Sequence, residues 1–173
     1  CYYKKDYPEK SDKGDGNPLT VATHLPNSPI IKTGKREGAK IRLPNGNYLE
    51  ETAYYYVLME TKAGGMTPAL ITMKSSQLSV SKNWNSMMKT IQIEDGKGGF
   101  VTPPMHAVVY NLSSAIQKND KGSWYGWSIT QDRIMGQEDK GLYKSAKEFA
   151  SSVSDGTVQA KADVEEKSDS TPY

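Results

Sequence analysis

The stretch that decides the fold reads SSQLSVSKNWNSMMKTI (residues 75–91), VTPPMHAVVYNL (residues 101–112) and NDKGSWYGWSI (residues 119–129). Apolar side chains in the first part recur at the spacing of one helical face, whereas the other two parts alternate as strands do. All three tryptophans of the chain lie in this stretch. It therefore predicts a helix followed by a pair of strands.

The predicted helix carries an apolar stripe made of Val80, Trp84, Met87 and Ile91. A serine just before the stripe can serve as N-cap, and the glycines of residues 96–99 end the segment. We expect Trp84 to pack inward, because it lies on the stripe, and Lys82 to point away from it.

The strand pair is predicted from residues 106–115, the turn at residues 119–122 and a returning strand at residues 123–130. Tyr125, Trp127 and Ile129 share one face of the returning strand, which we expect to be the core face. Trp124 lies on the other face beside a glycine, so its ring is expected to be free to stack on a partner.

Further strands are predicted at residues 39–43 and 47–51, around a Pro-Asn-Gly turn, and then at residues 52–61 and 68–73. The last of these is a continuous apolar run that suits a strand buried on both sides. A Pro-Pro pair at residues 103–104 delays the next strand to about Met105.

The two ends of the chain look different from its centre. Residues 1–38 are expected to be loop-rich, with extended pieces at 1–4 and 19–23, and a second helix is predicted over residues 138–154. Residues 157–173 have no apolar pattern and are expected to be a disordered tail, which leaves residues 1–156 as one domain.

The chain of 173 residues has a net charge of +2, but the charge is uneven. From Asp155 onward there are five acidic and two basic residues, a net of −3, which leaves +5 on the preceding 154 residues. The single cysteine, Cys1, excludes an internal disulfide and a Cys-rich zinc site. His24 and His106 are far apart in sequence, and no apolar run is long enough to span a bilayer. We expect a soluble, intracellular protein without metal or cofactor.

Aromatic residues and lysines alternate along this sequence, which is typical of a surface that stacks bases and follows a phosphate backbone. Neither a P-loop nor a hydrolytic motif such as Gly-x-Ser-x-Gly or HExxH is present. The predicted stacking residues are Trp124, Tyr125, Tyr54, Tyr56 and Tyr110. The predicted phosphate contacts are Lys74, Lys82, Lys118 and Lys121.

The C-terminal tail has a second predicted role. Its acidic and aromatic residues could compete with DNA for a basic surface or bind replication or recombination proteins, and the residues in question are Glu165, Glu166, Asp169 and Tyr173. A merely solubilising tail is the alternative.

The runs KSSQLSVSKNWNSMM, FVTPPM, VVYNL, NDKGSWYGW and LYKSAKEF resemble a family of small tailed-bacteriophage proteins described as single-stranded-DNA-binding proteins. The resemblance covers residues 54–153. It implies an OB-fold-like five-stranded barrel with a helix between the third and fourth strands, and the predicted order of elements, mainly β with two helices (α+β), fits such a barrel. It also implies a role in phage DNA replication or recombination in the host cytoplasm.

The first hypothesis is therefore non-catalytic binding of single-stranded DNA, with no membrane association and with homo-oligomerisation left open. The alternative is a protein-interaction or virion-associated module whose exposed aromatic residues form a protein interface. An enzyme acting on nucleic acid would need clustered carboxylates for a metal ion. The acidic pairs Glu50-Glu51 and Glu94-Asp95 point to opposite faces of their strands, which disfavours this third option.

Overall fold

The computed structural model of the chain describes residues 2–8, 20–38, 40–61, 63–120 and 122–158. These residues form antiparallel sheets and three α-helices, so the fold is mainly β in the broad α+β class. The strands are β1 (Tyr2–Tyr7), β2 (Ala22–His24), β3 (Lys35–Glu37), β4 (Lys40–Arg42), β5 (Tyr48–Glu60), β6 (Met66–Lys74), β7 (Ile93–Glu94), β8 (Phe100–Val101), β9 (Val108–Asn119) and β10 (Gly122–Ile134). The helices are α1 (Pro29–Thr33), α2 (Gln77–Thr90) and α3 (Lys140–Ser154), with 3-10 turns η1 (Met105–Ala107) and η2 (Gln137–Asp139).

The main sheet is organised around β5, a strand of 13 residues. Its first half pairs with β1 and with β4, and its second half pairs with β6, which gives a six-stranded sheet. The sequence predicted two separate strands here, over residues 47–51 and 52–61, whereas the structure has one. No turn interrupts the strand at the junction. Thr52 and Ala53 are buried and pair with Lys74 and Met73 of β6, so the strand continues through them.

The turn between β4 and β5 is the predicted one. The backbone N–H of Leu43 donates to the carbonyl of Asn47 at 2.8 Å, and Gly46 has a positive φ of 88° that a residue with a Cβ adopts only with strain. This turn sets the register in which Arg42 faces Tyr48. The prediction of a hairpin at this position is confirmed.

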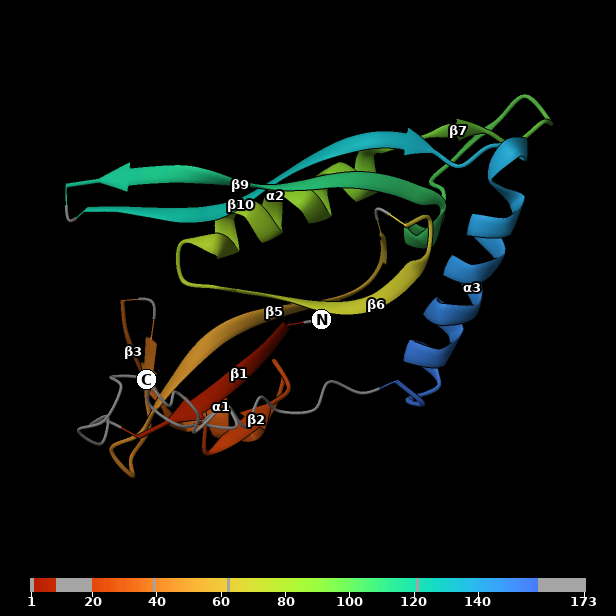
Figure 1. Cartoon of the computed structure of the whole chain (residues 1–173). Coiled ribbons are helices and arrows are strands. Elements are labelled where there is room, and N and C mark those ends of the chain that lie inside the picture. The colour runs from red at the N-terminus through yellow and green to blue at the C-terminus, as the bar shows by residue number, and fades with distance from the viewer. Residues whose placement is uncertain (1, 9–19, 39, 62, 121, 159–173) are drawn as a thin grey trace, which may run out of the picture.

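Helix α2 lies between the main sheet and the β9–β10 hairpin (Figure 1). Its buried residues are Ser81 and Trp84, and Trp84 packs in one cluster with Ala53, Ile71 and Met73 from β5 and β6. The ring of Tyr55 lies 4.4 Å from that of Trp84, and the Tyr55 hydroxyl is 2.8 Å from the Ser81 hydroxyl. Trp84 is 5% exposed, which confirms that it packs inward.

A second cluster lies at the other end of β5 and explains a helix that the sequence did not predict. Ile41, Leu43 and Leu49 are buried there, and Ile30 and Ile31 of α1 pack against them. Pro29 stands in the first turn of α1, where its missing N–H costs nothing. A helix of 5 residues is too short to show a period, so only its packing reveals it.

The sheets in the described residues do not close into a barrel. There β6 pairs only with β5, and β10 pairs only with β9, because α2 lies between these two strand pairs. The OB-fold-like five-stranded barrel is therefore not confirmed. The structure does place a helix, α2, between strand pairs, where it contacts β5 and β6 of the main sheet on one side and β10 of the hairpin on the other.

Several other boundaries differ from the predictions. Strand β6 is buried on one face only, through Ile71 and Met73, whereas it was expected to be buried on both. Strands β9 and β10 are both longer than predicted, and β9 begins at Val108, after η1. Helix α3 agrees with its prediction. At the N-terminus, β1 extends further than the piece predicted at residues 1–4, whereas β2 is shorter than the piece predicted at residues 19–23. Residues 9–19 and 159–173 lie outside the described residues.

Thr52 gives a stability prediction. It is 0% exposed, and its hydroxyl has no hydrogen-bond partner among the described residues. Burying an unpaired hydroxyl is unfavourable, and valine has nearly the same shape, so Thr52→Val should raise the free energy of unfolding by roughly 1–3 kcal/mol. Urea denaturation followed by circular dichroism measures this, with Thr130→Val on an exposed strand position as control. A loss of stability would mean that the hydroxyl has a partner.

Candidate nucleic-acid interface on the β9–β10 hairpin

The two faces of the β9–β10 hairpin follow from its register. Tyr125 lies opposite Ile116, and Trp127 lies opposite Ser114. Because side chains alternate along a strand, Lys118 and Ser123, which also pair, belong to the same face. We call the side chains of Ile116, Lys118, Tyr125 and Trp127 the arm face.

Nearer its base, the same face packs on the core. Tyr110, Leu112 and Ile129 are half-buried against the cluster that contains Trp84. Tyr110 lies edge-on to the Trp84 ring at 5.5 Å, and burial raises the pKa of the Tyr110 hydroxyl above its ordinary value. Tyr110 was predicted to stack on bases, but the structure sets its ring against Trp84.

Toward its tip the hairpin extends past the N-terminal end of α2, and this part is exposed (Figure 1). Tyr125 is 72% exposed, Ile116 59% and Trp127 38%. Lys118 is also exposed. None of the residues 112–118 and 123–129 is acidic, and the nearest carboxylate along the chain is that of the exposed Asp120 in the turn. The arm face thus combines exposed aromatic rings with a positive charge.

The hairpin is held to α2 by Gln77, the first residue of the helix. The Gln77 side-chain carbonyl accepts a hydrogen bond from the Trp127 backbone N–H at 2.9 Å, and its amide donates to Gln117 at 3.4 Å. Gly126 makes room for this side chain, since a Cβ there would lie 2.4 Å from the Gln77 amide nitrogen. The backbone between Tyr125 and Trp127 is therefore fixed by a residue of the helix.

Trp124 lies on the other face of the hairpin, as predicted, but its surroundings differ from the expectation. It is half-buried, and its indole N–H donates to Gln117 at 3.1 Å. The space beside Gly126 is filled by the side chains of Gln77 and Gln117. The glycine therefore accommodates two amide side chains, which occupy the space that was expected to be open at this position.

Tyr54, Tyr56 and Lys74 lie elsewhere, on the face of the main sheet that points away from α2. Tyr54 packs edge-on to Tyr3 at 5.3 Å, and the Lys5 ammonium lies 5.1 Å from its ring centre. Lys74 is 3.9 Å from a Glu50 carboxylate oxygen. Tyr54 already has an aromatic and a cationic neighbour, so it offers less ring surface than Tyr125.

The same arrangement continues along this face. The rings of Tyr7 and Tyr48 stack at 5.4 Å, and the Lys40 ammonium lies 3.9 Å from the centre of the Tyr48 ring. Burial is the first cause that raises the pKa of Tyr48 above its ordinary value. These contacts show a tyrosine and lysine cluster whose members bind one another.

The structure therefore separates the predicted site residues. Tyr125 and Lys118 lie together on the arm face, and Lys82 is exposed on α2. Lys121 and the tail residues Glu165, Glu166, Asp169 and Tyr173 lie outside the described residues. Sequence reasoning missed Ile116 and the exposure of Trp127. A predicted pairing register of the two strands would have placed Ile116 opposite Tyr125. The neighbouring residues in the sequence do not show which part of the hairpin α2 covers.

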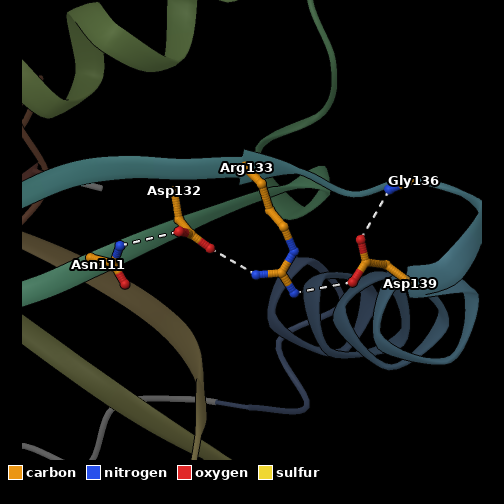
Figure 2. Close-up of polar contacts among 5 residues, drawn as sticks. All are labelled: Asn111, Asp132, Arg133, Gly136 and Asp139. Carbon is orange, nitrogen blue, oxygen red and sulfur yellow. Dashed lines mark hydrogen bonds and ion pairs between the residues drawn. The ribbon is translucent and has the colours of Figure 1, made fainter.

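The base of the hairpin is tied to α3 through a chain of polar contacts (Figure 2). Arg133 near the end of β10 donates to Asp132 at 2.7 Å and to Asp139 at 3.1 Å. The second Asp139 oxygen accepts the Gly136 backbone N–H at 3.1 Å, and Asp132 accepts from Asn111 at 3.3 Å. The Arg133 hydrogen bond, first, and the Gly136 N–H, second, lower the pKa of the Asp139 carboxyl below its ordinary value.

This lowered pKa predicts a pH dependence. A carboxyl whose pKa is lower in the folded state stabilises the fold above its unfolded pKa, near pH 4, and loses that contribution as the pH falls through its folded value. We expect Asp139→Asn to destabilise the protein at neutral pH and the difference from the wild type to shrink below about pH 4. Thermal unfolding at stepped pH values measures it. An equal difference at every pH would assign the effect to the amide substitution itself.

The acidic and histidine residues form no metal site in the described part of the chain. Glu51 pairs with Lys4 at 2.5 Å on the opposite face from Glu50, and Asp95 accepts the backbone N–H groups of Lys97 and Gly99. His24 lies 3.6 Å from Asp6, whereas His106 packs on the ring of Tyr143. Among the described helices, none is both long and apolar enough to cross a bilayer.

Comparison with known proteins places the chain in a family. None of the curated proteins or solved structures compared with it matches. The model of one family, the Pam3 phage gp34-like proteins, matches residues 1–159. Because this match covers most of the 173 residues, the chain belongs to the Pam3 phage gp34-like protein family.

Proposed function

We propose that this protein binds single-stranded DNA without catalysis, during phage DNA replication or recombination in the host cytoplasm. The observation that carries the proposal is the arm face, where Tyr125 and Trp127 are exposed beside Lys118. Stacking of a base on an aromatic ring contributes about 1–3 kcal/mol and tolerates any base sequence. A closed OB barrel is not needed for this mode of binding, since the rings stand on a two-stranded hairpin.

The electrostatic environment of the arm face supports a polyanionic ligand. Lys118 is a diagonal neighbour of Tyr125 across the hairpin, at about 7–8 Å between Cα atoms, and the strand residues 112–118 and 123–129 include no carboxylate, the nearest being Asp120 in the turn. A lysine at this distance can reach the phosphate of a nucleotide whose base lies on the ring. Binding should therefore be salt-dependent, because each neutralised phosphate releases counterions.

Tryptophan fluorescence tests the proposal directly. An unlabelled oligothymidine is titrated at two salt concentrations, with a matched duplex as control. Quenching by the single strand alone, weaker at the higher salt, is the expected result. Absence of quenching and of binding at low salt would overturn the proposal.

Lys118→Ala gives a more specific prediction. If Lys118 neutralises one phosphate, its removal should reduce the slope of log K against log salt by about 0.7. Lys144→Ala is the matched control, since Lys144 is 79% exposed on α3, at the end of the molecule away from the arm face (Figure 1). Equal slopes for the wild type and both variants would contradict a phosphate contact at Lys118.

The second candidate is a protein-interaction or virion-associated module. The observation that favours it is Ile116, an aliphatic side chain that is 59% exposed between the aromatic residues and Lys118. Aromatic residues are also enriched in protein interfaces. Ile116→Ser discriminates the two functions, because it should change oligonucleotide binding little and weaken a protein interface. If Ile116→Ser abolishes oligonucleotide binding and Tyr125→Ala does not, the bases do not stack on Tyr125. That result would contradict the first proposal.

A further inference from the structure

The spacing of Tyr125 and Trp127 on β10 has a specific consequence for what can bind there. They are two residues apart on one strand face, so their Cα atoms are about 6.6–6.8 Å apart. Successive nucleotides of a stacked DNA strand are about 3.4 Å apart along the helix axis, so a base with a ring on each side takes up two such spacings. The two values agree, so one base fits between the rings when both stand across the strand.

No ring contact or cation contact within the described residues involves Tyr125 or Trp127. Across the hairpin they face Ile116 and Ser114, and neither of these residues carries a ring that could close the slot between the two rings. The exposed fractions of 72% and 38% agree with rings that are open to a ligand.

The backbone at the slot is fixed in advance. Gly126 lies between the two aromatic residues and is buried against Gln77 and Gln117, and the Trp127 N–H donates to Gln77. A site whose backbone is already ordered loses less entropy when a ligand binds. The helix therefore holds the backbone that carries the two rings.

We propose that Tyr125 and Trp127 hold a single unpaired nucleobase between them, a purine more tightly than a pyrimidine, with Lys118 on an adjoining phosphate. The inference rests on the proposed binding of single-stranded DNA and adds its stoichiometry at this site: one base per arm face. Bases inside a duplex are stacked on both sides already and cannot enter the slot. Purines are favoured because their larger rings cover more of each aromatic face.

Oligonucleotides with a single base test the proposal. The probe is a strand of abasic nucleotides that carries one adenine, compared with the same strand carrying one thymine, two adjacent adenines or no base. We expect one adenine to tighten binding about fivefold or more over the fully abasic strand. The thymine should give a smaller gain, and a second adenine should add less than about twofold.

A double-mutant cycle provides the second readout. Tyr125→Ala and Trp127→Ala should each weaken binding of the one-adenine strand, and the double variant should lose less than the product of the two single losses. This follows because removal of either ring opens the slot to water. Losses that multiply, together with a second adenine that is as effective as the first, would show that each ring stacks a separate base and would overturn the slot. If no strand binds the wild type, the proposed function fails as well.

Discussion

Trp84→Ala is expected to lower the free energy of unfolding by about 3–5 kcal/mol. Trp84 is 5% exposed and lies between the two sheets, with the Tyr55 ring at 4.4 Å on one side and the Tyr110 ring at 5.5 Å on the other. Its removal would leave a cavity where the main sheet, α2 and the hairpin meet. Urea denaturation followed by far-UV circular dichroism measures the loss.

Trp84→Phe is the matched control for this prediction. The indole N–H of Trp84 has no hydrogen-bond partner among the described residues, so phenylalanine gives up no hydrogen bond. We expect it to lose clearly less stability than the alanine variant, since a ring remains between Tyr55 and Tyr110. An alanine variant as stable as the wild type would contradict the placement of Trp84 in the core.

The position of Trp84 could be predicted because its cause is local. One helical stripe is defined by residues three and four apart, and the helix places them on one face whatever the rest of the chain does. The same is true of α3 and of the Pro-Asn-Gly turn before β5, where Gly46 supplies the positive φ. Each of these predictions depended on a few neighbouring residues.

The sheet arrangement could not be predicted in the same way. Whether β6 and β10 pair to close a barrel depends on where α2 lies, and the order of strands along the chain is the same in either case. Helix α1 could not be predicted for the same reason. Its residues Ile30 and Ile31 pack on the cluster that contains Leu49, which is distant in sequence. Long-range contacts decided both outcomes.

The candidate site shows both kinds of prediction in one strand. Alternation correctly grouped Tyr125, Trp127 and Ile129 on one face and Trp124 on the other. Their exposure depended on a contact that is distant in sequence: Gln77, 50 residues before Trp127, packs beside Gly126 on the face that carries Trp124. At this level Tyr125 and Trp127 are exposed on the arm face, whereas Ile129 nearer the base packs on the core.

Trp127→Ala is expected to weaken oligothymidine binding by about 1–3 kcal/mol, or roughly 5- to 150-fold in Kd. The reason is the loss of one stacking surface on the arm face, where Trp127 is 38% exposed. Fluorescence anisotropy of a labelled oligothymidine measures the change without relying on the tryptophans. The free energy of unfolding should change far less than in Trp84→Ala, because Trp127 is not part of either buried cluster.

Trp124→Phe is the control on the opposite face of the same strand. It keeps most of the packing of a half-buried ring and removes only the hydrogen bond to Gln117. It should therefore cost about 1 kcal/mol of stability and leave oligothymidine affinity nearly unchanged. If Trp124→Phe weakens binding and Trp127→Ala does not, the bases stack on the face that carries Trp124, and the arm face has another partner. Since the two tryptophans are three residues apart on one hairpin, a general distortion of the hairpin would affect both variants and would also appear in their unfolding curves.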